Sequence, residues 1–502
     1  MEQIILPQIF QNHMMLQREK PIHVWGEGPD GAVITVCLKG TRASVQVRNN
    51  KWHCTLPSQP ACVGAELLVL CDIPGFPVIK LTDIAIGDIW LAGGQSNMEF
   101  FLRYDAHWDE IRQAPVNPNI RMFNVPRLSF EGQQKDISDS GYWFSEQDSA
   151  WETFSAPGYC FARAIQPELG VPVGIIGCNY GGSPACAWVP EEVLENDVDL
   201  SNFIMEYEDE YFGKDQAVLR NQALQGYAYE DSLLHQEEWK AMMYGLSREE
   251  QLAWQKDHQG QPEIPMGPLH MWRPSGLYHH MLKPLIPFSL KGVLWYQGES
   301  DSGHAELYYS MFSTLIACWR KQWGDELPFL FVQLAPFGQW LDCDSTGYPL
   351  VRRCQDLITK TVPHAYMTSI MDLGMYWDIH PKHKKEVGER LALLARGKIY
   401  GEDILCEPGE FKSAAREGNR LVLSFSHAGE SLKVQGDAIN DLHINPGALT
   451  PKSWTVSSNQ LILEFDSLPE TPLTLEFAET GYAEVNLFNS AGLPVKPFTC
   501  KV

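Results

Sequence analysis

The sequence lacks the features that would tie a protein to a membrane or to nucleic acid. Its 502 residues contain no run of about 18 apolar residues, the length that marks a candidate membrane-spanning helix. Basic residues are scarce, since 39 Lys and Arg stand against 63 Asp and Glu and give a formal net charge of −24. Nucleic acids and anionic membrane surfaces both require clustered basic side chains. We therefore expect neither partner, and the sequence leaves the oligomeric state open.

The marks of an exported protein are also missing. The first residues do not combine a basic start with an apolar core, and no Asn-x-Ser/Thr sequon occurs. The 12 cysteines are scattered from Cys37 to Cys500 without a CxxC pair. This pattern is typical of free thiols in a reducing compartment. We expect a cytoplasmic protein, or a periplasmic or secreted one if a leader has been removed.

Several common catalytic and cofactor motifs are absent. There is no Walker A sequence and no GxSxG nucleophile elbow. Residues 26–31 fit GxGxxG, but a strand-like run follows them instead of the helix that would receive a pyrophosphate. His380 and His383 form an HxxH pair without the glutamate and the spacing of a zinc-protease helix. We therefore predict no dinucleotide site and no metal site.

The residues that are present are typical of a globular α/β protein with several domains. Hydrophobic residues make up 44% and charged residues 20% of the chain. Residues 1–85 consist of short strand-like runs separated by turn clusters, which predicts a β-sandwich or jelly-roll module. Residues 405–502 return to strands and turns, which predicts a second β-rich module.

Between these modules, residues 86–404 alternate short apolar runs with helical patterns. The runs at 88–92, 173–178, 292–296, 328–333 and 367–371 are nearly continuous in apolar character, as strands buried on both faces are. The segments 308–323 and 383–400 have helical patterns. This alternation predicts a parallel sheet in a three-layer α/β/α fold. Residues 195–265 interrupt it with an acidic, partly helical insertion, which is a lid, an interface or a solvated excursion.

Ser96 lies in a glycine-rich turn directly after the first of these runs. In the sequence Gly93-Gly94-Gln95-Ser96-Asn97, the serine occupies the carboxyl end of a strand and the start of a helix. That position exposes its hydroxyl and lets its own N–H face an oxyanion. A helix N-cap serine is the alternative, and for this segment alone it is the more common one.

Three further polar turns follow predicted strands. They are Asn179–Ser183 with paired glycines, Gln297–Asp301, and Asp378–His380. Taken singly, these are a tight turn, a helix start with acidic residues and a structural His–Asp pair. In open α/β sheets, however, ligands bind at the edge where the carboxyl ends of the strands meet. The convergence of four such turns favours a catalytic site.

Together these segments resemble the sialate O-acetylesterase family of SGNH (GDSL-like) hydrolases. The blocks Gly94–Met98, Trp295–Ser300 and Asp378–Pro381 are similar to the signatures of that family, and the likeness runs nearly end to end. The resemblance implies an SGNH-type α/β fold, flanked by antiparallel β-sandwich segments, that needs no cofactor.

The resemblance also implies roles for individual residues. Ser96 is then the nucleophile, His380 the general base and acid, and Asp378 the residue that orients His380. The oxyanion hole consists of the N–H groups of Ser96 and of Gly181 or Gly182, together with the Gln297 side chain. Because the acid commonly precedes the histidine by three residues, where Trp377 stands here, a Ser–His dyad or another acid such as Asp301 or Asp372 stays open.

The implied activity is hydrolysis of sugar acetyl esters through an acetyl-serine intermediate. The alternatives are an acetylxylan or plant-polysaccharide esterase of the same family and a non-catalytic carbohydrate-binding protein. An acetylated carbohydrate is the expected partner. Candidate substrate-binding residues, with the tryptophans that are candidates to line a sugar site, are Gln95, Asn97, Arg273, Tyr278, Glu299, Trp188, Trp295 and Trp377. For an aromatic residue a core position is the alternative.

Overall fold

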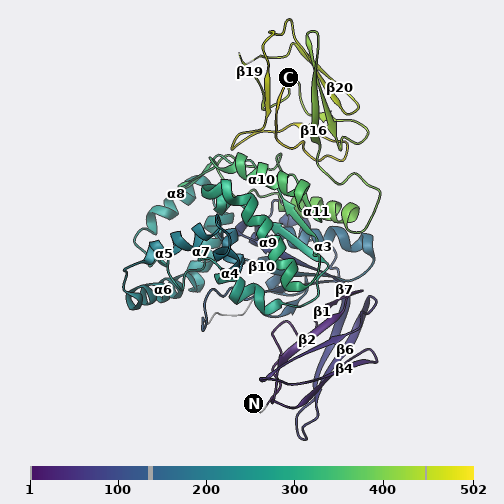
Figure 1. Cartoon of the computed structure of the whole chain (residues 1–502), viewed down its shortest axis with the longest axis vertical. Coiled ribbons are helices and arrows are strands. Elements are labelled where there is room, and N and C mark those ends of the chain that lie inside the picture. Colours follow the sequence, from purple (N-terminus) through teal and green to yellow (C-terminus); the bar gives the residue numbers. More distant parts are fainter. Residues whose placement is uncertain (1–2, 134–139, 447–448) are drawn as a thin grey trace.

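The computed structural model describes residues 3–133, 140–446 and 449–502. Figure 1 shows three parts in a column, with N-terminal strands at one end, C-terminal strands at the other and a helix-rich α/β part between them. Among the described residues, no helix combines the length and apolarity needed to cross a bilayer.

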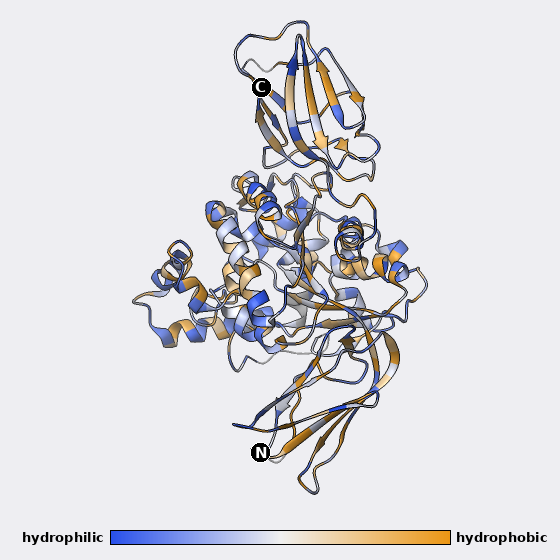
Figure 2. Ribbon diagram, turned by 45° about the vertical axis from the view of Figure 1, so that its right-hand side comes forward, coloured by the Kyte–Doolittle hydropathy of each residue, from blue (hydrophilic) through white to orange (hydrophobic). Residues whose placement is uncertain are grey.

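The N-terminal part consists of antiparallel strands whose side chains alternate between a buried and an exposed face, as β5 with its strict alternation shows. Figure 2 shows hydrophobic and hydrophilic residues alternating along strands at both ends of the molecule. The strands of this part are β1 (Met15–Gln17), β2 (Ile22–Glu27), β3 (Val33–Leu38), β4 (Thr41–Gln46), β5 (Lys51–Leu56), β6 (Cys62–Cys71) and the beginning of β7 (Ile79–Gly94).

Strand β7 passes through the predicted boundary at residues 85 and 86. Its first half pairs with β6 and β1, and its second half, from Asp88 on, pairs with β10 and β11. Asp88 is fully buried and accepts hydrogen bonds from Arg18 at 2.9 and 2.8 Å. The N-terminal strands are thus continuous with the central sheet, and the division into three domains stays a prediction.

The central sheet has the order β15-β12-β11-β7-β10-β8-β9. All neighbouring pairs are parallel except β8 and β9, which are antiparallel. The predicted parallel sheet is therefore confirmed only in part, because a two-residue edge strand and the N-terminal strands make the sheet mixed. Its strands beyond β7 are β8 (Ile120–Asn124), β9 (Trp143–Phe144), β10 (Val173–Asn179), β11 (Gly292–Tyr296), β12 (Phe329–Val332) and β15 (Ala365–Thr368).

Alternate residues of each strand pack against helices on opposite faces. In β11, Val293 and Trp295 share a core with α9, whereas Leu294 and Tyr296 share one with α3 and α11. This alternation explains why the run is apolar without a gap. The helices around the sheet are α1 (Ser96–Glu99), α2 (Trp108–Ile111), α3 (Ala156–Leu169), α9 (Tyr308–Trp323), α10 (Tyr348–Thr361) and α11 (Lys384–Lys398).

The predicted insertion is helical over more of its length than the sequence indicated. Its helices extend to one side of the central part in Figure 1. They are α5 (Ser201–Tyr211), α6 (Gln216–Glu230), α7 (Leu233–Tyr244) and α8 (Arg248–Asp257), and the short helix α4 (Glu191–Glu195) leads into the insertion.

The C-terminal strands form antiparallel sheets around a core of their own. Buried Arg352 of α10 connects this part to the central one by donating to the carbonyls of Thr480 at 2.6 Å and Gly481 at 2.9 Å. The strands are β16 (Glu410–Glu417), β17 (Arg420–Ser426), β18 (Lys433–Val434), β19 (Leu442–Asn445), β20 (Ser453–Ser457), β21 (Gln460–Glu464), β22 (Thr474–Phe477), β23 (Leu487–Phe488) and β24 (Phe498–Lys501).

The central part also contains a small hairpin, in which β13 (Gln339–Trp340) pairs with β14 (Cys343–Asp344).

Candidate active site

Three adjacent strands end side by side and bring their polar turns together. Gly94 at the end of β7 stands opposite Asn179 of β10 and Tyr296 of β11. The turns are then joined directly, since the Gln95 N–H donates to the Tyr296 carbonyl at 3.1 Å and the Tyr180 N–H to the Gly94 carbonyl at 3.0 Å. The chain also reverses its winding direction here, because β10 and β11 lie on opposite sides of β7. Such a switch point is where open α/β sheets bind their ligands.

Gly94 allows the chain to turn sharply from β7 into α1. Its φ is +135°, and a Cβ at this position would lie 2.1 Å from the Tyr296 carbonyl oxygen. A side chain would therefore both strain the backbone and collide with β11. The turn delivers Ser96 as the first residue of α1, with only 4% of its surface exposed.

The hydroxyl of Ser96 meets the imidazole of His380. Ser96 Oγ and His380 Nε2 are 2.9 Å apart. His380 lies on the loop between β15 and α11 and is 2% exposed. Its ring packs edge-on against Tyr244 at 5.2 Å and Trp340 at 5.1 Å between ring centroids. These rings hold the imidazole in one orientation toward the hydroxyl.

Burial sets the protonation state of His380. It lowers the pKa of the imidazole to about 4, although the nearby Asp378 carboxylate acts in the opposite direction. The neutral imidazole is therefore the form present at neutral pH, and it can accept the proton of a serine hydroxyl.

Asp378 is the carboxylate that touches His380. Its Oδ1 accepts the backbone N–H of His380 at 2.8 Å and lies 3.7 Å from the ring Nδ1. Its Oδ2 pairs with Lys382 at 2.8 Å. Burial acts to raise the pKa of Asp378, but His380 and Lys382 outweigh it and lower the pKa. Asp378 is thus an anion beside the imidazole, and His380 Nδ1 has no hydrogen-bond partner among the described residues.

The two other candidate acids have different partners. Asp372 forms a two-bond ion pair with Arg390, at 2.6 Å for each bond. Asp301 accepts the Ala185 N–H at 3.0 Å and a hydrogen bond from the Gln297 amide, and burial raises its pKa to about 6. Within the described residues, neither carboxylate contacts His380.

The oxyanion donors expected from the sequence are only partly available. The Gly181 N–H donates to Glu99 Oε2 at 2.8 Å, and the Gln297 amide donates to Asp301 and to the Ser183 carbonyl at 3.3 Å. In the described part of the chain, the N–H groups of Ser96 and Gly182 meet no protein acceptor. A Cβ placed on Gly181 would lie 3.7 Å from the Ser96 Cβ, so this turn borders the nucleophile.

Gln95 and Asn97, which were expected to contact substrate, use their polar atoms inside the protein. Gln95 Oε1 accepts the N–H groups of Gly298 at 3.3 Å and Ser300 at 3.2 Å. Asn97 Nδ2 donates to Glu299 Oε1 at 2.5 Å. Both side chains are nearly fully buried. They join the turn after β7 to the turn after β11, and so does Glu299, the third residue of this group.

The sequence gives no indication of a fully buried lysine close to Ser96. Lys384 Nζ donates to Asn97 Oδ1 at 2.6 Å, and burial lowers its pKa to about 7 although Glu299 acts to raise it. Burial in turn raises the pKa of Glu299, whose Oε2 has no hydrogen-bond partner among the described residues. The sequence shows Lys384 only as the second residue of the helical pattern predicted for 383–400, and the observed helix α11 begins at Lys384.

The remaining candidates for sugar contacts lie elsewhere. Arg273 donates to the Ser129 carbonyl at 3.3 Å, and Tyr278 is buried in the hydrophobic core. Trp188 and Trp295 are core residues with 0% and 1% exposure, whereas Trp377 is 43% exposed. Of these residues, only Trp377 presents an aromatic surface next to the catalytic loop.

The insertion contributes residues that the sequence did not place near the site. Tyr244 of α7 contacts His380 and donates to the Ser96 carbonyl at 3.2 Å. Arg248 of α8 lies 3.4 Å above the centre of the Trp377 ring. These two helices therefore form one wall of the site.

Glu99 is the second missed feature. This buried carboxylate lies three residues after Ser96, where it pairs with Lys240 of α7 at 2.6 Å and with Arg127, and it accepts the Gly181 N–H. Burial acts to raise the pKa of Glu99, but the two cations outweigh it and hold the pKa at about 2. In the sequence, Glu99 is only an acidic residue near the start of a predicted helix. Nothing there indicates that it forms ion pairs with Lys240 and Arg127.

Comparisons with known proteins agree with this geometry. The family model for the carbohydrate esterases described as sialic acid-specific acetylesterases matches residues 86–228 and 265–395. The sialate O-acetylesterases of Rattus norvegicus and Homo sapiens are 26% and 25% identical, over 98% and 97% of this chain and 93% and 90% of theirs. The crystal structure of a carbohydrate acetylesterase from Xanthomonas citri aligns with a TM-score of 0.74 and 29% identity over 99% of both chains.

The match covers both segments that carry Ser96 and His380, and its gap spans α7 and α8. The wall formed by these two helices is therefore outside the part of the chain that the family model describes. The matched ranges make up more than half of the sequence and include all the strands of the central sheet after β7. The resemblance read from the sequence is confirmed: the chain belongs to the family of carbohydrate esterases described as sialic acid-specific acetylesterases.

Proposed function

We propose that the protein hydrolyses acetyl esters of sugar hydroxyls, with a sialate ester as the preferred substrate class and Ser96 as the nucleophile. The observation that carries this proposal is the 2.9 Å contact between Ser96 Oγ and His380 Nε2 in a chain of this family. The curated relatives are named sialate O-acetylesterases, which favours sialate over xylan. An SGNH-type arrangement of the catalytic turns is part of the same proposal.

The first step forms an acetyl-enzyme. Ser96 Oγ attacks the acetyl carbonyl while His380 Nε2 takes the hydroxyl proton. The tetrahedral intermediate collapses, the ester bond to the sugar oxygen breaks, and His380 returns the proton to that oxygen. The sugar leaves as an alcohol, and the acetyl group stays on Ser96.

The second step releases acetate. His380 takes a proton from water, the resulting hydroxide attacks the acetyl carbonyl, and the proton returns to Ser96 Oγ as the bond breaks. The N–H groups of Ser96 and Gly182 are the proposed donors to the oxyanion in both steps, because neither has a protein acceptor among the described residues. Asp378 holds the imidazole through both steps.

The direct test is a measurement of acetate release from three substrates: acetylated sialic acid, acetylated xylan oligosaccharides and p-nitrophenyl acetate. We expect turnover of the sialate ester, and rapid quenching followed by mass spectrometry of the peptide that carries Ser96 should show one added acetyl group. Sugar binding without acetate release would contradict the proposal. Faster turnover of xylan would leave the mechanism intact and change the substrate class.

Replacing Asp378 by Asn should lower kcat by about 10²-fold or more. The amide no longer stabilises the imidazolium that forms when His380 takes the proton. The apparent pKa of the kcat/KM profile should also move to a lower value, because Asp378 acts to raise the pKa of His380 and the amide does not. Asp372→Asn is the matched control, since its carboxylate pairs with Arg390 and should leave the pH profile unchanged.

The pH dependence of kcat/KM follows from the buried histidine. The base must be neutral, and burial lowers the pKa of His380 to about 4. We expect kcat/KM to be level from pH 8 down to about pH 5 and to fall below that as the imidazole binds a proton. An acid limb near the ordinary histidine value, about 6.5, would show that burial does not set this pKa.

A further inference from the structure

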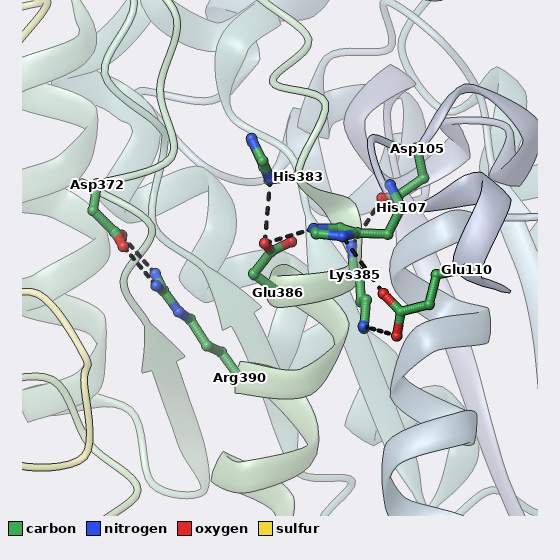
Figure 3. A network of polar contacts seen from close by, with 8 residues as sticks. All are labelled: Asp105, His107, Glu110, Asp372, His383, Lys385, Glu386 and Arg390. Carbon is green, nitrogen blue, oxygen red and sulfur yellow. Dashed lines mark hydrogen bonds and ion pairs between the residues drawn. The ribbon is translucent and has the colours of Figure 1, made fainter.

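A second cluster of ionisable side chains lies beside the catalytic loop and is separate from Ser96. It consists of His107, just before α2, and of His383 and Glu386 at the beginning of α11 (Figure 3). One ligand atom of each residue lies within 4.8 Å of those of the other two. Glu386 and His107 are partly buried and His383 is exposed, so a small ion can reach the cluster from solvent.

The donor atoms of the cluster already converge on one carboxylate. Glu386 Oε1 lies 2.8 Å from His107 Nε2 and 3.2 Å from His383 Nδ1 (Figure 3). The second oxygen, Glu386 Oε2, is buried and has no hydrogen-bond partner among the described residues. A buried carboxylate oxygen without a donor is costly unless a cation or a water molecule occupies the space beside it.

The surroundings hold His107 in place from the other side. Its Nδ1 lies 3.8 Å from Glu110 Oε2, a distance within ion-pair range but too long for a hydrogen bond. Its backbone N–H donates to Asp105 at 2.7 Å. Asp105 also accepts the Lys385 N–H at 2.9 Å, which connects the two segments that carry the cluster.

The charge around the cluster favours a cation. Four carboxylates lie around the cluster, three of them labelled in Figure 3, and Lys385 pairs with one of these, Glu110, at 2.7 Å. Because the imidazoles are neutral when they coordinate, the site presents a net negative charge to an incoming ion. The four carboxylates are Asp105, Glu110, Glu386 and Glu389.

We propose that His107, His383 and Glu386 bind one divalent transition-metal ion, with zinc as the best fit. Two imidazole nitrogens and one carboxylate oxygen suit zinc better than magnesium or calcium, which prefer oxygen ligands. Tetrahedral zinc places its ligand atoms about 3.4 Å apart, so small movements of these side chains open the space required. Three protein ligands leave one position for water.

The position of the cluster indicates what the ion does. His383 follows His380 by three residues, and the Ala106 N–H donates to the Lys382 carbonyl at 2.9 Å, so the ion would fasten the catalytic loop to the segment after α1. The sequence does not indicate this site, because its HxxH pattern couples His383 with His380. In the structure, the Nε2 atom of His380 faces Ser96 instead. The informative spacing was His383 and Glu386, one helical turn apart.

The test uses the full chain after treatment with a chelator. Titration with ZnCl₂ by isothermal calorimetry should show one ion bound per chain and a rise in Tm. His383→Gln and Glu386→Gln should abolish both effects. His443→Gln, on the exposed face of the C-terminal part, is the matched control and should bind zinc as the wild type does.

Cobalt separates this site from the thiols of the protein. Co²⁺ bound by two nitrogens and one oxygen gives d–d absorption without a thiolate charge-transfer band. A charge-transfer band, zinc binding retained by the His383→Gln and Glu386→Gln variants, or no uptake of micromolar zinc by the wild type would each overturn the proposal. None of these outcomes bears on the ester hydrolysis proposed for Ser96.

Discussion

Ser96→Ala should lower kcat for acetate release by about 10³-fold or more and leave the fold unchanged. In the proposed mechanism this hydroxyl carries the acetyl group, and without it His380 Nε2, 2.9 Å away, has no proton to accept. Removing one oxygen from a residue that is 4% exposed leaves the packing of α1 intact. Initial rates with acetylated sialic acid and a thermal melt of each protein measure the two effects.

Two comparisons make this result specific. Ser201→Ala, at the first residue of α5 in the insertion, should keep wild-type kcat and Tm. A fluorophosphonate probe should label the wild type and the Ser201 variant at Ser96 and should not label Ser96→Ala. Equal acetate release by wild type and Ser96→Ala would disprove the acetyl-serine mechanism.

Glu99→Gln should produce the largest loss of stability, about 3–5 kcal/mol. The substitution keeps the volume of the side chain but removes the buried negative charge that pairs with Lys240, which is 8% exposed, and with Arg127. It also weakens the anchor of the Gly181 N–H, which borders Ser96. We therefore expect a lower free energy of unfolding in urea together with a lower kcat.

A matched pair of variants separates the buried charge from the loss of a carboxylate as such. Glu237→Gln removes an exposed partner of Arg103 and should change stability by less than about 1 kcal/mol. The double variant Glu99→Gln/Lys240→Met removes the buried cation as well and should recover part of the lost stability. If Glu99→Gln were as stable as the wild type, the ion pairs of Glu99 would make no net contribution to the free energy of unfolding.

The helices α7 and α8 show how the insertion takes part in the site. They supply Lys240 to Glu99, Tyr244 to His380 and Arg248 to Trp377. The sequence left this segment open between a lid, an interface and a solvated excursion. A helical sequence pattern does not specify which residues its buried face contacts. Only the folded structure shows that these helices form a wall of the site.

Local patterns predicted the strands and helices well where the residues repeat a strong period. The run 292–296 and the helix 308–323 have the bounds expected from the sequence. The run 367–371 does not: β15 spans Ala365–Thr368, because pairing with β12 begins at Ala365 and the chain turns after Thr368. Strand ends depend on the neighbouring strand, which no local pattern contains.

By itself, the sequence determined the order of elements, the strand ends at which the polar turns occur and the membership of a carbohydrate esterase family. These features follow from the local preferences of residues for helix, strand or turn and from motifs whose residues are contiguous in the sequence. The tertiary structure alone decided which acid contacts His380, which N–H groups are already occupied, and that Glu99, Lys384 and the residues of α7 and α8 surround Ser96. Most of those facts depend on contacts between residues far apart in the sequence, such as Lys384 with Asn97, and burial, which sets their charges and pKa values, exists only once the chain has folded.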